Sequence, residues 1–269
     1  MKTSKNKLST FLTVLVITAS FTSCQKEKLD INKSAANVSG NISEIANSEI
    51  LTAIDVADQS FKNEGCATVT RDMVSMPHVL TIDYGTTGCV ARDGKRRQGQ
   101  LIITFDQANF EVPGVNIVST FNNYFLDGKE ITGNSTKHND GFNGNHHLTY
   151  SVTSHTQIFD PNTSASSTED AQQVYEILSG TGTPITTDDI HSITGSSNGT
   201  DVNGNYYAES ITSPIIKKRD PGCSLFYIQG VVVNQTAGQP VRTTDYGTGA
   251  CDNLANVTVN GVTTTITLH

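Results

Sequence analysis

The sequence predicts an all-β protein, an antiparallel meander of strands, and three observations point to this class. Apolar and polar residues alternate with a period of two, as they do in strands with one buried face. Threonine and β-branched residues, which suit a pleated and half-solvated surface, fill these stretches. Asn-Gly and Asp-Gly pairs separate them, and both pairs tolerate the positive φ angles of tight hairpin turns. The strands should form a sandwich, a barrel or one long curved sheet.

Two stretches show the alternation most clearly. Leu101, Ile103 and Phe105 share one face of a strand in the middle of the first half. At the C-terminal end, residues 257–259 and 262–268 flank an Asn-Gly pair at 260–261, which predicts a two-residue hairpin. The C-terminal hairpin is therefore the most sharply defined element of the prediction.

Six turn pairs divide the chain into about ten to twelve strands. The stretch from Asp160 to Asp170, with a proline and a serine run, is expected to be a long exposed loop. A β-rich unit of this length is expected to be one domain, residues 42–269. The six pairs are Asp93-Gly94, Asp127-Gly128, Asn143-Gly144, Asn198-Gly199, Asn203-Gly204 and Asn260-Gly261.

One N-terminal helix, residues 48–63, is expected ahead of the strands. Ser48 can cap it, and apolar residues recur at helical spacing from Ile50 to Phe61 before Gly65. Its apolar stripe should pack on the β-rich body as a lid or an edge cover.

The N-terminus has the features of a secretory signal peptide, residues 1–23. Lys2, Lys5 and Lys7 precede an apolar stretch over residues 8–21, and small residues lead to Cys24. This stretch is too short for a comfortable membrane span, which needs about 20 apolar residues.

The cysteine at the end of this leader resembles the lipobox of bacterial lipoproteins. Phe21 replaces the usual leucine three positions earlier, a position where bulky apolar substitutes are common. The resemblance implies that Cys24 becomes the first mature residue and carries the acyl chains. Residues 24–41 would then form a lipid-anchored flexible spacer. Since the body is acidic, acyl-chain burial and not headgroup attraction would hold it on the membrane.

The other four cysteines are expected to form disulfides, because an even count is typical of exported chains. A repeat of the form Asp-Tyr-Gly-x-x-x-Cys ends at Cys89 and again at Cys251, and each copy has an upstream cysteine. The simplest pairing is local, Cys66 with Cys89 and Cys223 with Cys251. The crossed pairing, Cys66 with Cys251 and Cys89 with Cys223, stays open if the two copies pack side by side.

Composition excludes some functions. A hydrophobic fraction of 36% is too low for a polytopic membrane protein, and a net charge of −8 argues against nucleic-acid binding. No cofactor and no catalytic residue are expected. The basic group Arg92, Lys95, Arg96 and Arg97 is interpreted as a solvated hairpin tip.

Several motifs resemble catalytic or metal-binding sites but lack residues that such sites need. Residues 195–199 match the letters of a nucleophile elbow, but no helix follows, so a small polar turn is expected. No metal site is expected, since His147 and His155 share a strand face but lie about 26 Å apart at about 3.3 Å per residue. His138 with His146 or His147 could meet across a hairpin. Two stretches, which begin at Asp160 and at Asp201, have side chains with oxygen atoms at every second position, as calcium loops do. Both lack the glycine and the glutamate that a calcium loop of the EF-hand type requires.

Taken whole, the chain resembles lipoproteins of the Bacteroidota kind. The resemblance rests on the lipobox at Phe21–Cys24, the expected helix before Cys66, the Asp-Tyr-Gly…Cys stretch with the following residues 96–105, and the C-terminal 249–261 stretch. It implies outer-membrane residence and brings no activity with it. The first hypothesis is a lipid-anchored, non-enzymatic protein that binds a glycan, an envelope protein or an apolar molecule. The alternatives are a glycan hydrolase, which clustered carboxylates in a cleft would favour, and a purely structural envelope component.

Overall fold

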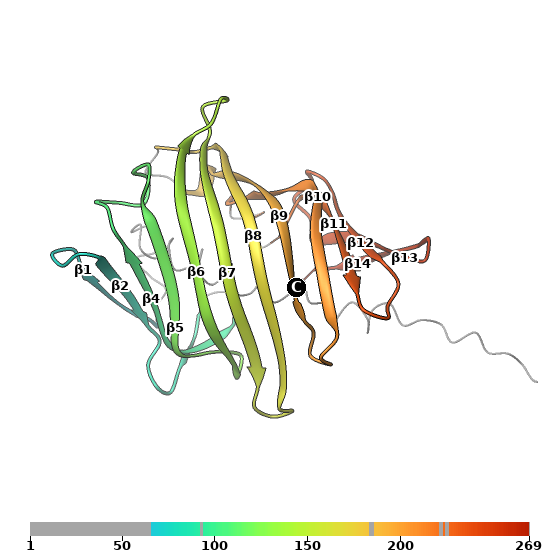
Figure 1. Cartoon of the computed structure of the whole chain (residues 1–269), viewed down its shortest axis with the longest axis horizontal. Coiled ribbons are helices and arrows are strands. Elements are labelled where there is room, and N and C mark those ends of the chain that lie inside the picture. The colour runs from blue at the N-terminus through green and yellow to red at the C-terminus, as the bar shows by residue number, and fades with distance from the viewer. Residues whose placement is uncertain (1–65, 92–93, 183–185, 221–222, 224–225, 269) are drawn as a thin grey trace, which may run out of the picture. The chain divides into compact units, whose positions relative to one another are not determined.

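The computed structural model describes residues 66–91, 94–182, 186–220, 223 and 226–268. Within these residues fourteen strands form one sheet, and neighbouring strands follow one another in chain order, except that β3 pairs with β4 off the main path (Figure 1). The strands are β1 (Thr68–Asp72), β2 (His78–Asp83), β3 (Cys89–Val90), β4 (Arg96–Phe105), β5 (Asn116–Leu126), β6 (Lys129–Phe142), β7 (Leu148–Asp160), β8 (Ala165–Ser179), β9 (Ile190–Thr200), β10 (Tyr206–Lys218), β11 (Gln229–Thr236), β12 (Arg242–Thr248), β13 (Leu254–Val259) and β14 (Val262–Thr267).

The predicted fold class, an all-β antiparallel meander, is confirmed. Every strand pair is antiparallel, and among the three expected forms the molecule adopts the long open sheet, with β1 and β14 at its edges. The described residues form fourteen strands, more than the predicted ten to twelve. Tight turns between consecutive strands make this order the natural one, since a hairpin needs only a few connecting residues.

The expected helix over residues 48–63 lies outside the described residues. Among the described ones the only helical segment is η1, the 3₁₀ turn Thr186–Asp188. No helix in the described part of the chain has the length and hydrophobicity required to cross a membrane.

The sheet has one buried face and one exposed, polar face, as strand alternation requires. In β4, Leu101, Ile103 and Phe105 are buried while the residues between them are partly exposed, as predicted. Two apolar clusters form the core, and each fully buried large side chain contributes about 1.5–3 kcal/mol. The first cluster comprises Leu80, Ile82, Tyr84, Leu101, Ile103, Phe105, Val115, Ile117, Tyr124, Leu126, Ile131 and Ile158. The second comprises Leu148, Tyr150, Val152, Tyr175, Ile193, Ile215 and Val232.

Three of the predicted turn pairs form tight turns. Asp127-Gly128 and Asn260-Gly261 each have two positive φ angles, 49° and 81° in the first pair and 50° and 76° in the second. Each pair connects adjacent strands as a two-residue hairpin. Asn203-Gly204 lies in the turn between β9 and β10, where Gly204 donates its N–H to the carbonyl of Asp201.

Two other pairs behave differently. At Asn143-Gly144 the left-handed residue is His146, and the Asn143 side chain accepts N–H bonds from Asn145 and His147. Asn198-Gly199 is not a turn at all but part of β9. A Cβ at Gly199 would lie 1.9 Å from the carbonyl oxygen of Thr168, so this glycine allows β8 and β9 to approach closely. Of the sixth pair, Asp93-Gly94, only Gly94 lies within the described residues. Its N–H donates a hydrogen bond to the carbonyl of Ala91.

The expected long loop from Asp160 to Asp170 is also wrong. The connection is a short turn over residues 161–164, and β8 begins at Ala165. The turn is stabilised by the Asp160 carboxylate, which accepts the N–H of Asn162, and by Ser164 at a φ of 58°. The serine run enters the strand because Ser166 and Ser167 pair with Phe159 and Ile158 of β7, and Ser167 is buried.

Both disulfides follow the simpler, local pairing. Cys66 is bonded to Cys89 with their Cα atoms 5.8 Å apart, and Cys223 is bonded to Cys251 with a Cα separation of 5.0 Å. Disulfides persist in oxidising compartments, so the two bridges indicate an extracytoplasmic protein.

The repeated Asp-Tyr-Gly stretch has the same local geometry in both copies. The Asp83 carboxylate accepts the N–H of Gly85 at 2.7 Å, and the Asp245 carboxylate accepts that of Gly247 at 2.8 Å. Both glycines have positive φ, 74° and 89°. The first copy follows the end of β2 as expected, whereas Asp245 and Gly247 lie within β12. The repeated stretch therefore has a structural role. In each copy the aspartate side chain stabilises a bend in the backbone that precedes the downstream cysteine.

Candidate functional site

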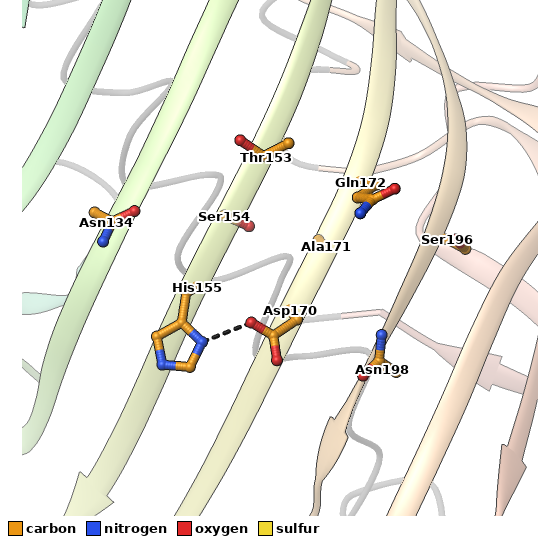
Figure 2. A pocket seen from close by; sticks show the side chains of 9 residues that line it. All are labelled: Asn134, Thr153, Ser154, His155, Asp170, Ala171, Gln172, Ser196 and Asn198. Carbon is orange, nitrogen blue, oxygen red and sulfur yellow. Dashed lines mark hydrogen bonds and ion pairs between the residues drawn. The ribbon is translucent and has the colours of Figure 1, made fainter.

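A shallow depression of about 390 Å³ crosses the exposed face of β6, β7, β8 and β9. We call it the polar groove (Figure 2). Its lining combines amide, hydroxyl, imidazole and carboxylate groups, with no lysine, arginine or aromatic ring of Phe, Tyr or Trp. The lining residues are Asn134, Thr153, Ser154, His155, Asp170, Ala171, Gln172, Ser196 and Asn198.

Strand register aligns these side chains in two rows across the sheet. In the first row, Asn134 pairs with His155, His155 with Asp170, and Asp170 with Asn198. Neighbouring strands lie about 4.8 Å apart, so this row presents one hydrogen-bonding side chain at each such step.

The second row runs parallel to the first. Thr153 pairs with Gln172, which in turn pairs with Ser196. Between the rows lie Ser154 and Ala171, whose side chains point to the opposite face by strand alternation. Because these side chains point away from the groove, the backbone of the two residues forms its floor.

Two neighbouring residues of the first row, His155 and Asp170, are in close contact. Nδ1 of the imidazole lies 2.6 Å from Oδ1 of the carboxylate (Figure 2). The two side chains are 60% and 59% exposed, so their contribution to stability is small. Both side chains are therefore accessible to a ligand.

The four neighbouring histidines identified in the sequence do not converge. His155 lies in the polar groove, while His147 lies 2.7 Å from a Glu176 carboxylate oxygen. Hydrogen bonds from His147 and then from Asn143 hold the pKa of Glu176 below its usual value. His146 is exposed at the tip of the β6–β7 hairpin. Within the described residues, no three potential metal-binding side chains gather in one place.

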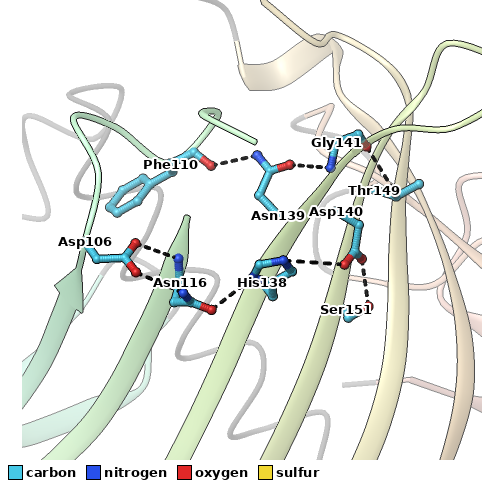
Figure 3. A network of polar contacts seen from close by, with 9 residues as sticks. All are labelled: Asp106, Phe110, Asn116, His138, Asn139, Asp140, Gly141, Thr149 and Ser151. Carbon is cyan, nitrogen blue, oxygen red and sulfur yellow. Dashed lines mark hydrogen bonds and ion pairs between the residues drawn. The ribbon is translucent and has the colours of Figure 1, made fainter. Parts of the chain in front are cut away.

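His138 belongs to a separate polar network at the end of β5 and β6 (Figure 3). Its Nδ1 lies 2.9 Å from the amide oxygen of Asn116, and the Asn116 amide donates to Asp106. On the other side, Nε2 of His138 lies 4.0 Å from Asp140, which accepts the hydroxyl of Ser151. The network connects neighbouring strands, and its polar groups already form hydrogen bonds with one another.

In the same region, the buried Asn139 holds the loop between β4 and β5. Its side-chain amide donates to the carbonyl of Phe110, and its amide oxygen accepts the N–H of Gly141 (Figure 3). This loop carries the Phe110 ring to within 4.7 Å of the Phe105 ring, where it packs on the first apolar cluster.

The remaining sequence motifs have structural roles. Residues 195–199 lie within β9, so they form neither a nucleophile elbow nor the expected polar turn. The Asp201 carboxylate accepts the N–H groups of Asn203 and Asn205, so this stretch is a tight turn and not a calcium loop. The adjacent acids Asp188 and Asp189 do not line the polar groove.

The interpretation of the basic group as a solvated tip is wrong for Arg97. This arginine is 2% exposed, and its guanidinium lies 6.0 Å from the centre of the Tyr84 ring. Alternation along β4 turns Arg97 toward the buried face, whereas Arg96 remains exposed and donates to the carbonyl of Thr87. Arg92 lies outside the described residues.

A buried histidine lies on the other face of the sheet. His191 in β9 has its Nε2 3.7 Å from Asp189, whose carboxylate also lies 3.5 Å from Arg219. Burial lowers the pKa of His191, and the positive charges of Lys137 and Arg219 lower it further, against the opposing effect of Asp189. The imidazole is therefore neutral in the folded protein near pH 7.

This arrangement predicts a pH-dependent loss of stability. An unfolded histidine binds a proton as the pH falls below about 6.5, whereas native His191 resists protonation, so acidification favours unfolding. Urea unfolding midpoints should fall between pH 7.5 and 5.5, and His191→Gln should reduce this fall. His146→Gln is the control. Since His146 is exposed in the folded protein, this substitution should leave the fall in the urea midpoint unchanged. An equal reduction in both variants would contradict the assignment.

The structure brings together residues that the sequence did not single out as a site. Sequence patterns pointed to His155 as a surface histidine, to Ser196 and Asn198 as parts of a polar turn, and to Asp170 as the end of a loop, but to none of them as parts of one site. The signal was present as polar residues at every second position of β7, β8 and β9. The lipid-attachment residue predicted at Cys24 lies outside the described residues, while Cys66, Cys89, Cys223 and Cys251 are the disulfide cysteines.

Comparison with known proteins adds no assignment: no family model, no curated protein and no solved structure matches this chain.

Proposed function

We propose that this chain is a lipid-anchored, extracytoplasmic binding protein that holds a neutral glycan of the cell envelope in the polar groove without catalysing a reaction. The single observation that carries the proposal is the composition of the groove, in which hydrogen-bonding side chains line an exposed depression that contains one carboxylate. Outer-membrane residence is part of the proposal and rests on the resemblance of the whole chain to lipoproteins of the Bacteroidota kind, while the lipid anchor rests on the lipobox at Cys24.

The chemistry of the groove suits sugar hydroxyl groups. A hydroxyl both donates and accepts hydrogen bonds, and the amides of Asn134, Gln172 and Asn198 offer both functions at their ends. The carboxylate of Asp170 adds a charged acceptor, whose hydrogen bonds are stronger than those of neutral groups. Side chains repeated across successive strands suit a repeating polymer better than a single small molecule.

Charge favours a neutral glycan over an acidic one. The lining contains neither lysine nor arginine, and Asp170 would repel a second carboxylate or a sulfate. The net charge of −8 adds a long-range repulsion for polyanions.

The same composition argues against the hydrolase alternative. Most glycoside hydrolases place two carboxyl groups on either side of the scissile bond. Asp170 is the one carboxylate among the lining residues. The lining also offers no aromatic ring of Phe, Tyr or Trp on which a sugar could stack, so hydrogen bonds must supply the specificity.

Affinity electrophoresis tests the proposal. The full chain with Cys24→Ala, which removes the acylated residue, should be retarded in native gels that contain neutral polysaccharides and not in gels that contain alginate. Asp170→Ala should weaken binding by about ten- to a hundredfold, because a hydrogen bond to a charged group contributes about 1.5–3 kcal/mol.

Gln157→Ala is the matched control for this experiment. Gln157 is an exposed amide on the same strand and the same face as His155, but it does not line the groove. Retardation should be unchanged in this variant. Migration unaffected by every neutral polysaccharide would contradict the glycan assignment, and release of new reducing ends by the unmodified chain would contradict the non-enzymatic role.

A further inference from the structure

The two edges of the open sheet differ in how they are protected. At one edge, β1 is a short strand that carries Arg71 and Asp72. The Asp72 carboxylate accepts the N–H groups of Val74 and Ser75, and hydrogen bonds from Ser75 and Val74 lower its pKa to about 2. This edge is therefore charged at any ordinary pH, which is a common defence against strand pairing.

The opposite edge, formed by β14, has no such protection. Residues 254–268, which include both β13 and β14, contain no charged residue and no proline. Within the described part of the chain β14 pairs with β13 alone, so its outer side has no strand partner. An uncharged and extended edge strand is a template for pairing with another strand.

The hairpin geometry identifies which backbone groups face this free edge. Val259 and Val262 flank the two-residue turn, and such flanking residues exchange their hydrogen bonds with each other. At the other end, the N–H of Leu268 donates to the carbonyl of Asn253 at 2.7 Å. Since the direction alternates along a strand, the backbone groups of Thr263, Thr265 and Thr267 point outward.

We propose that β14 pairs antiparallel with β14 of a second copy of this chain, across a twofold axis at Thr265. In this register Thr265 lies opposite itself, and Thr263 lies opposite Thr267 of the other copy. All three residues then use their outward N–H and C=O groups. The sheet would continue from one molecule into the next, with an isologous interface of the kind most common in dimers.

Charge and preorganisation favour a second copy as the occupant. Two molecules of net charge −8 repel each other over most of their surface, but an uncharged edge brings no like charges into contact. The incoming strand is already formed by its pairing with β13, and the hydroxyl of Thr265 is fixed by a 2.8 Å bond to Asn256. Pairing therefore avoids the cost of ordering a flexible peptide.

Sedimentation velocity on the full chain with Cys24→Ala tests the interface. We expect a dimer, and Thr265→Lys should convert it to a monomer because two like charges would lie directly opposite each other. Thr258→Lys is the matched control: Thr258 lies on the same face of the same hairpin, one strand away from the edge. This variant should remain dimeric. A monomeric parent chain, or a dimer that persists in Thr265→Lys, would overturn the proposal.

A disulfide trap tests the register. The Cα atoms of a hydrogen-bonded antiparallel pair lie about 5.5 Å apart, within the range that a disulfide bridges. In the Cys24→Ala background the four remaining cysteines are already bonded. Mild oxidation of Thr265→Cys should therefore give a covalent dimer on non-reducing gels, while Thr258→Cys should give little. Equal cross-linking of both variants would mean random collision and would refute the register.

Discussion

Removal of either disulfide should destabilise the protein strongly. The double variants Cys66→Ala with Cys89→Ala, and Cys223→Ala with Cys251→Ala, are each expected to lower the free energy of unfolding by about 3 kcal/mol. The bridges close loops with sequence separations of 23 and 28 residues, and the open loops gain conformational entropy in the unfolded state. Urea denaturation under non-reducing conditions measures the effect.

The location of each disulfide predicts which part of the sheet loses stability when that disulfide is removed. Cys66–Cys89 connects the segment just before β1 to β3 and packs against the first apolar cluster. Cys223–Cys251 connects the segment before β11 to the segment before β13, and Cys223 is buried. Hydrogen exchange should therefore accelerate at the edge strands first, because these have fewer neighbours than the central strands.

The fifth cysteine provides the control. Cys24→Ala should leave the free energy of unfolding unchanged, since the sequence predicts that this residue belongs to the flexible spacer. A loss of less than about 1 kcal/mol in both double variants would mean that the sheet does not depend on its bridges.

The second large effect concerns membrane attachment. Cys24→Ala should move the protein from the membrane fraction to the soluble fraction of the cell, because it removes the proposed site of acylation. Each methylene of a buried acyl chain contributes about 0.8 kcal/mol, so the anchor dominates the partition. Immunoblots of fractionated cells measure this shift.

A disulfide cysteine controls for the loss of a thiol. Cys89→Ala should stay in the membrane fraction even though it is less stable. Mass spectrometry of the N-terminus provides an independent test, since the mature chain should begin with a lipid-modified cysteine. A Cys24→Ala protein that still pellets with the membrane would refute the anchor, whereas the groove and the edge of the sheet would be unaffected by that result.

Much of the fold could be predicted from the sequence because its causes are local. The alternation at Leu101, Ile103 and Phe105 fixes which face of β4 is buried, whatever the neighbours are. The Asn260-Gly261 turn follows from two residues that tolerate positive φ. The repeated Asp-Tyr-Gly-x-x-x-Cys stretch likewise predicted local disulfides, because the two cysteines of each pair are near each other in the chain.

The failures share a different cause. Asn198-Gly199 has the letters of a turn, yet hydrogen bonds to β8 and β10 hold it in a strand. The serine run after Asp160 has the composition of a loop, but its pairing with β7 makes it the start of the longest strand. In each case non-local pairing overrides a local preference.

By itself the sequence predicted the strand period, the hairpin turns at Asp127-Gly128 and Asn260-Gly261 and, as the simplest pairing, the two local disulfides, while the export signal stays a prediction. Only the tertiary structure decided that the sheet stays open, that Arg97 is buried, and that His155, Asp170 and Asn198 form one row. The reason is physical: turns and alternation depend on φ and ψ of a few consecutive residues, whereas register and edges depend on hydrogen bonds between strands far apart in the chain. The groove and the free edge of β14 exist only once that register is set.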